Sequence, residues 1–195
     1  LIVEGASYSG LRVWGPAKLA GNPNDPTENV TIRYVIARNN TGHGISSMGK
    51  VIGVVIEYCQ AYDNWGTGII FRQVSRAFHS EQPEDNKCAA HDSIMRNCLA
   101  YNNEHPSSPG NTDGIGGQST YKAIYENNVV FTNSDDGIDI YMSFESVVKN
   151  NIIFGHQHPE GNKAGIKFSA GGGGRHTIGE NTIINNGGVA LEGSN

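Results

Sequence analysis

Short stretches of alternating apolar and polar residues recur along the chain, and turns rich in Asn end most of them. Clear examples are "RYVIARNN" (33–40) and "ENNVVFTN" (126–133), and four further stretches of this kind lie between residues 57 and 186. A period of two predicts β-strands, and Asn is a favoured turn residue. No segment keeps an apolar period of 3.6 residues, so we expect few or short helices.

A shorter phrase repeats among these strands: a small or polar residue, then Gly, then Ile or a similar residue. It occurs as "SGL", "HGI", "TGI", "DGI" twice, "AGI" and "GGV", and its glycines are 34, 24, 46, 23, 28 and 23 residues apart. The repeat unit is therefore about two dozen residues long, with insertions in some copies.

Units of this length with three short strands each predict an all-β fold, the right-handed parallel β-helix, with coils stacked about 4.8 Å apart. We expect one domain over residues 1–195, with about seven coils and loop insertions. Asn40, Asn64, Asn103 and Asn133 should form a hydrogen-bonded ladder along the axis. The chain begins and ends within the repeat pattern, so we also expect that end coils are missing.

Stacking places equal offsets in neighbouring repeats next to one another. The residue after Gly gives an inward apolar column, Ile45, Ile69, Ile115, Ile138, Ile166 and Val189. The next residue gives the column Ser46, Ile70, Gly116, Asp139, Lys167 and Ala190. Before Gly, Asp113 should lie beside Asp136, with Asp135 adjacent at the turn. Four carboxylates and one lysine should therefore converge on one patch.

Composition and charge restrict the partners of the protein. Gly is frequent, at 26 residues, charged residues make up only 17%, and the formal net charge is −5. This charge argues against nucleic acid as a partner. No stretch is long and apolar enough to span a membrane. An acidic polymer would also be repelled, unless a cation or a basic cluster lies between.

The three cysteines show no spacing typical of a metal site. Cys59 and Cys98 fall in one column, so we interpret them as buried free thiols, with a disulfide between coils as the alternative. Cys88 lies in an insertion.

Four carboxylates on adjacent coils indicate a hard divalent cation. Ca²⁺ accepts six to eight oxygen ligands in loose geometry, whereas Mg²⁺ prefers fewer carboxylates. The predicted Ca²⁺ ligands are Asp113, Asp135, Asp136 and Asp139. Two alternatives stay open: these residues only form turns, or the calcium is purely structural.

Lys167 adds chemistry to this patch. Beside a bound cation its ammonium form is disfavoured and its pKa should fall. A neutral amine there could remove a carbon-bound proton, while the cation holds a substrate carboxylate. This combination suits β-elimination from a uronic acid polymer.

The segments "NTDGIGG", "NSDDGIDIY" and "GNKAGIKFSAGGGGRHT" resemble, in order and spacing, the active-site stretch of pectate lyases of polysaccharide lyase family 9. The resemblance covers about residues 102–186. It implies calcium-dependent cleavage of polygalacturonate (pectate) or a related uronan. It also implies Asp113, Asp135, Asp136 and Asp139 as calcium ligands and Lys167 as the base. The expected protein is a monomer that acts on an acidic polysaccharide outside the cell or in the periplasm.

Three further cations, Arg72, Lys163 and Arg175, could bind neighbouring sugar carboxylates, although each could equally be a solvated surface charge. The insertions at 72–91, 104–111 and 157–163 should form the walls of a binding groove.

Two rival functions remain at this point. In an inverting polygalacturonase-type hydrolase, also a β-helix, the carboxylates would act as acid and base about 6.5–9.5 Å apart. A non-catalytic β-helix could instead bind carbohydrate and structural calcium, because this fold serves many functions.

Overall fold

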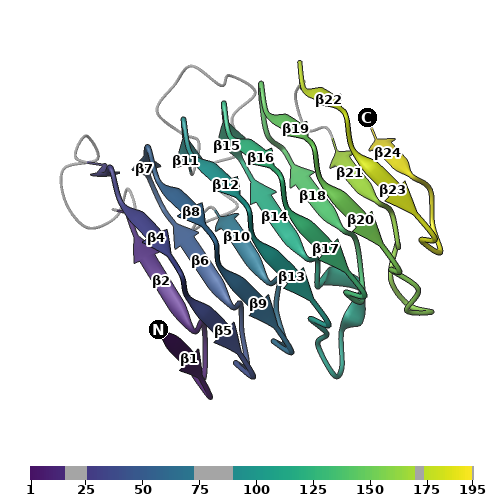
Figure 1. Cartoon of the computed structure of the whole chain (residues 1–195), viewed down its shortest axis with the longest axis horizontal. Helices are drawn as coiled ribbons and strands as arrows, with labels where there is room; N and C mark the ends of the chain where they lie inside the picture. The colour runs from purple at the N-terminus through teal and green to yellow at the C-terminus, as the bar shows by residue number, and fades with distance from the viewer. Residues whose placement is uncertain (16–25, 73–89, 170–173, 195) are drawn as a thin grey trace.

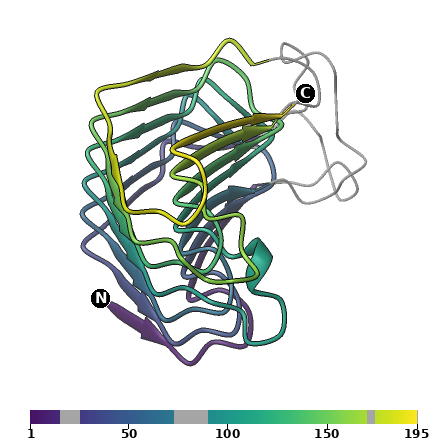
Figure 2. The same ribbon diagram turned by 90° about the vertical axis from the view of Figure 1, so that its right-hand side faces the viewer.

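The computed structural model describes residues 1–15, 26–72, 90–169 and 174–194, and these form a right-handed parallel β-helix. The coils stack from the purple N-terminal end to the yellow C-terminal end, as Figures 1 and 2 show. All strand pairs between coils are parallel in the described segments, and there are four sheets. The predicted fold class is therefore confirmed.

Two sheets of seven strands run the length of the solenoid. The first, which we call the aromatic sheet, contains β1 (Ile2–Glu4), β5 (Ile36–Arg38), β9 (Gln60–Tyr62), β13 (Leu99–Tyr101), β17 (Val129–Phe131), β20 (Ile152–Phe154) and β23 (Thr182–Ile184). The second, the site sheet, contains β2 (Leu11–Trp14), β6 (Ile45–Met48), β10 (Ile69–Arg72), β14 (Ile115–Gln118), β18 (Ile138–Tyr141), β21 (Ile166–Ser169) and β24 (Leu191–Ser194).

The remaining strands form two sheets where the sequence predicted one further strand per coil. The charged sheet contains β4 (Thr31–Arg33), β8 (Val55–Glu57), β12 (Ile94–Arg96), β16 (Ile124–Glu126), β19 (Val147–Lys149) and β22 (Thr177–Gly179). The short sheet contains β3 (Thr27–Glu28), β7 (Val51–Ile52), β11 (Ala90–His91) and β15 (Thr120–Tyr121). A bend thus divides the third face in the first four coils, whereas the following coil keeps the expected three strands, β17, β18 and β19.

The described residues contain one 3₁₀ turn, Pro109–Asn111, as their only helix. They contain no helix long and apolar enough to cross a membrane. The inward apolar column is confirmed for Ile45, Ile69, Ile115, Ile138 and Ile166, whose side chains have no exposed area. Cys59 and Cys98 are buried free thiols, as predicted, and Cys88 lies outside the described residues.

The last repeat is aligned differently from the prediction. Leu191, not Val189, pairs with Ile166, and Val189 is 53% exposed. Ala190 takes the place of the repeat glycine, because its carbonyl accepts the N–H of Ile166. The phrase "GGV" misled the alignment, since the small residue followed by an apolar one is the pair at 190–191. Glu192, rather than Ala190, therefore follows Lys167 in its column.

Candidate metal and substrate site

Two turns and one strand of the site sheet carry the aspartates. Asp113 and Asp136 each precede the repeat glycine that leads into β14 and β18, and Asp139 lies within β18. The glycines are required by packing. A Cβ on Gly114 would lie 2.1 Å from Val130 Cγ1, and one on Gly137 would lie 2.4 Å from Ile153 Cγ2. A residue with a side chain therefore does not fit at either position.

The predicted columns are confirmed at this point of the sheet. The N–H of Gly114 donates to the carbonyl of Asp136, so the two aspartates occupy equivalent positions on adjacent coils. Asp139 pairs with Gly116 on one side and with Lys167 on the other. Repeat alignment thus predicted these neighbours correctly.

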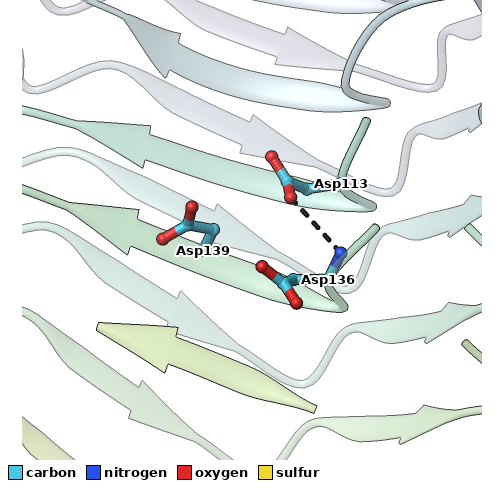
Figure 3. Close-up of side chains that lie close together, drawn as sticks. All are labelled: Asp113, Asp136 and Asp139. Carbon is cyan, nitrogen blue, oxygen red and sulfur yellow. Dashed lines mark hydrogen bonds between the residues drawn. The ribbon is translucent and has the colours of Figure 1, made fainter. Parts of the chain in front are cut away.

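Three carboxylates converge, as Figure 3 shows. Asp113, Asp136 and Asp139 each offer an oxygen, and these oxygens all lie within 4.8 Å of one another. Asp136 has no exposed area, and the Asp139 side chain is 16% exposed. The cluster is therefore largely shielded from water but open at Asp139.

Backbone and hydroxyl groups hold two of these carboxylates. Asp113 accepts hydrogen bonds from the Asp136 N–H (3.4 Å) and from Thr67 Oγ1 (3.3 Å). Asp136 Oδ1 accepts one from the N–H of Ala164 at 2.8 Å. Asp139 Oδ1 is buried and has no hydrogen-bond partner among the described residues. An acceptor left in this state calls for a cation or a proton.

Asp135 lies beside the cluster and outside the group of three. Its side chain is buried, and its Oδ1 accepts the N–H of Asn162 in the loop at 157–163. Neighbouring residues in a turn face different ways, so Asp135 and Asp136 serve different partners. The structure brings together three of the four predicted ligands, and Asp135 anchors a loop.

Lys167 reaches the same cluster from the next coil. Its Nζ lies 3.2 Å from Asp136 Oδ2 and 3.9 Å from Asp139 Oδ2, and its side chain is 18% exposed. The predicted contact between Lys167 and the aspartates is therefore present.

Burial shifts the proton affinities of these groups. It raises the pKa of Asp136 to about 6 and that of Asp139 to about 7, and the neighbouring carboxylates add to both shifts. The pKa of Asp113 is also raised, first by burial and then by Asp139. Burial lowers the pKa of Lys167, but Asp139 and Asp136 outweigh it, so the net shift is upward. A lowered pKa at Lys167 would thus require the carboxylates to be neutralised by a cation.

The three aspartates fit a hard divalent cation such as Ca²⁺. They supply only oxygen atoms, one from each residue is close enough to share one ion, and two buried oxygens, Asp136 Oδ2 and Asp139 Oδ1, lack a hydrogen bond among the described residues. Oxygen ligands in loose geometry suit Ca²⁺. Water or a substrate carboxylate would complete the coordination.

The other predicted cations lie at different distances from the cluster. Lys163 directly precedes Ala164, whose N–H binds Asp136, so it is at the edge of the cluster. Arg72 ends β10, two coils before β18 on the site sheet. Arg175 precedes β22 of the charged sheet, is 73% exposed and forms an ion pair with Glu145. Arg175 thus already has a carboxylate partner.

Two of the predicted loop walls contact each other. Oε1 of Glu104, in the segment at 104–111, lies 3.3 Å from Nε2 of His158, in the segment at 157–163. Ser134 Oγ donates to the carbonyl of Pro109 at 2.8 Å. Both loops therefore pack beside the turn that carries Asp135. Residues 73–89, which make up most of the insertion at 72–91, lie outside the described residues.

Comparison with known proteins identifies the family. The family model described as "Right handed beta helix region" matches residues 85–195, more than half of the chain, so the chain belongs to this family. No curated protein sequence matches the chain.

Three solved structures share the fold at low sequence identity. The A-module of the mannuronan C-5 epimerase AlgE4 from Azotobacter vinelandii has a TM-score of 0.64 and 14% identity, over 98% of this chain and 53% of that one. The enzymatically active domain of tailspike protein 2 from bacteriophage CBA120 has a TM-score of 0.67 and 10% identity, over 98% and 26%. The pectate lyase Pel9A has a TM-score of 0.57 and 15% identity, over 95% and 55%. This chain spans about half or less of each of them, and the likeness concerns the fold.

Proposed function

We propose that this protein is a calcium-dependent polysaccharide lyase that cleaves polygalacturonate, or a related uronan, by β-elimination. The carrying observation is that Lys167 contacts Asp136 and Asp139 in a three-aspartate cluster that fits a hard cation. The motifs around these residues resemble those of family 9 pectate lyases, and one similar fold is a pectate lyase. We further propose that the protein acts as a monomer, outside the cell or in the periplasm.

The residues divide the chemistry between them. Calcium held by Asp113, Asp136 and Asp139 would bind a sugar carboxylate and make the adjacent C5 proton more acidic. Lys167 Nζ, once neutral, takes this proton. The C4–O bond then breaks, the leaving oxygen carries away its electron pair and gains a proton from water, and a C4=C5 double bond remains. Asp135 acts as a positioning residue, because it fixes the loop at Asn162.

The first test follows ultraviolet absorbance of polygalacturonate with the protein at alkaline pH. We expect absorbance to rise with calcium, because each cleavage leaves an unsaturated sugar, and to stop rising when a chelator is added. A flat trace with new reducing ends would indicate a hydrolase. A flat trace without new ends would indicate a binding module.

Substituting Lys167 separates catalysis from metal binding. We expect Lys167→Ala to lower the initial rate at least ~1000-fold, in the range of losses found when a proton-transfer group is removed. Calcium affinity, measured by calorimetry, should stay the same or increase, because a positive charge is removed beside the site. A loss of calcium affinity in this variant would contradict the role of Lys167 as base.

One distance weakens the rival hydrolase. An inverting hydrolase needs room for a water molecule between two carboxyl groups about 6.5–9.5 Å apart. One oxygen from each of Asp113, Asp136 and Asp139 lies within 4.8 Å of the chosen oxygens of the other two. This spacing favours a shared cation.

A further inference from the structure

Basic side chains gather on the N-terminal part of the site sheet, away from the aspartates. Arg12 of β2 lies in the outward column that leads to the cluster, which reads Arg12, Ser46, Ile70, Gly116, Asp139, Lys167 and Glu192. Arg72 ends β10, on the same outward face. These two arginines are four and two coils before Asp139.

Both arginines act on His43, since the charge of each lowers its pKa. Arg72 donates from Nη1 to Nε2 of His43 at 2.9 Å. Burial, together with the charges of Arg72 and Arg12, lowers the pKa of His43 to about 4, so His43 is neutral and can accept this bond. His43 and the two arginines together therefore carry two positive charges.

Neither arginine is neutralised by a carboxylate in the part of the chain that the structure describes. Arg12 donates from Nη2 to Ser9 Oγ at 3.1 Å, and its guanidinium carbon lies 4.0 Å from the centre of the Tyr8 ring. Arg12 Nε is buried and has no hydrogen-bond partner there. Two guanidinium groups two coils apart on one sheet, one of them with an unused donor, could each bind an anionic group such as a carboxylate.

The opposite end of the column carries the opposite charge. Glu192 pairs with Lys167 across β21 and β24, one coil beyond Lys167 and two coils beyond Asp139. An acidic polymer is therefore repelled on the C-terminal side of Lys167 and attracted on the N-terminal side. Ile70 and Gly116 are buried, carry no charge, and lie in this column between the arginine coils and Asp139.

We propose that the bound uronan runs from the aspartate cluster toward the N-terminal coils, where Arg72 and Arg12 bind the carboxylates of more distant sugar units. This assignment rests on the proposed function, since it uses the same substrate class. Coils are about 4.8 Å apart, so Arg72 and Arg12 lie about 10 Å and 19 Å along the axis from Asp139. One sugar unit is about as long as one coil spacing, so the bound segment is about five units long.

The test measures binding of galacturonate oligomers of two to six units to Lys167→Ala protein by calorimetry with excess calcium. We expect affinity to increase with length up to about five units. Arg72→Gln with Arg12→Gln should weaken binding of the longest oligomers at least ~10-fold but leave the dimer unchanged. Arg33→Gln, on the charged sheet, is the matched control and should change nothing. Thermal midpoints of all variants confirm that they fold.

Equal losses for dimer and pentamer, or no loss in the double arginine variant, would overturn the proposed direction. The proposed direction would also be overturned if Glu192→Gln, and not the two arginine substitutions, changed how affinity depends on oligomer length. These outcomes are independent of the lyase reaction. If wild-type protein fails to cleave polygalacturonate but binding still depends on length and on both arginines, the direction stands and the lyase proposal fails.

Discussion

Each aspartate of the three-aspartate cluster loses its proton less readily than an aspartate in water does. Asp136 and Asp139 lie among other carboxylates with little water around them, and burial raises the pKa of both. Without a cation the folded protein holds protons here that the unfolded chain would release. Metal binding at this cluster is therefore linked to loss of protons and to the stability of the fold.

Replacing Asp139 should reveal this linkage. The folded pKa of Asp139 is about 7, above its ordinary value of 3.8, so its ionisation destabilises the calcium-free fold as pH rises from about 4 to 7. At pH 8 in chelator we expect Asp139→Asn to be more stable than wild type by about 2 kcal/mol, or about 4–8 °C in thermal midpoint. At pH 4 the two midpoints should agree.

We compare the stability of the variant with that of wild type because other groups of the protein titrate in the same pH range. Burial lowers the pKa values of His43, His156 and His176, which makes stability rise with pH. These groups are common to both proteins and cancel. Calcium should stabilise only wild type, and equal stabilisation of Asp139→Asn would show that Asp139 is not a ligand.

At the scale of elements, the corner after each strand of the aromatic sheet explains the paired asparagines. The first residue of the corner is left-handed, as in Asn39 (φ 54°) and Asn102 (φ 52°), a conformation that Asn tolerates. The second residue turns inward, and here Asn40, Asn64 and Asn103 are fully buried. One residue type thus serves two different requirements.

The inward asparagines form the predicted ladder. Asn40, Asn64 and Asn103 each donate from Nδ2 to the Oδ1 of the next member, ending at Asn133, at 2.8–2.9 Å. His156 occupies the following position, and its Nδ1 lies 3.3 Å from the carbonyl of Asn133. The ladder fixes the register of neighbouring coils.

Interrupting this ladder should destabilise the fold without touching the site. Asn103→Ala leaves the buried N–H and amide groups of Asn64 without their acceptor and removes two donors. We expect the free energy of unfolding to fall by about 2–4 kcal/mol, measured by urea titration. Asn111→Ala, at an exposed position, is the control and should cost little. A similar small cost at Asn103 would contradict a structural role for the ladder.

The sequence predicted what depends on the repeat and missed what depends on its exceptions. The neighbours of Asp139 follow from counting residues from Gly114, Gly137 and Gly165, because each glycine is fixed by packing against the next coil. Asp135 is a carboxylate, as a calcium ligand should be. Its side chain instead accepts the N–H of Asn162 in the loop at 157–163. Glu192 was missed, since Ala190 substitutes for a glycine.

At the scale of the whole molecule, charged residues are arranged differently on the charged sheet and on the site sheet. On the charged sheet, residues alternate in sign along one column, and pairs such as Arg96–Glu57 (2.8 Å) and Lys149–Glu126 (3.3 Å) neutralise one another. On the site sheet, positive charge lies toward the N-terminal end and negative charge around the cluster. The first arrangement favours correct stacking, and the second favours an anionic ligand.

Salt should therefore affect binding more than folding. Screening lengths fall from about 10 Å at 0.1 M to about 3 Å at 1 M salt, and Arg12 and Arg72 are partly exposed. At fixed free calcium, we expect the affinity for galacturonate pentamer to fall at least ~10-fold over this range, by calorimetry. The thermal midpoint should move little, because exposed ion pairs contribute little to stability. A steeper salt effect on the midpoint than on affinity would contradict this division.

Because the coils are evenly spaced, the number of coils between them sets the distance from the arginines to the aspartates. A coil without insertions, such as the one from Asp113 to Asp136, adds 23 residues and one strand spacing. Inserting such a coil between β10 and β14 would move Arg72 and Arg12 about 4.8 Å farther from the aspartates and leave every contact within each coil unchanged. The preferred oligomer would then lengthen by one sugar, so that chain length is measured in whole coils.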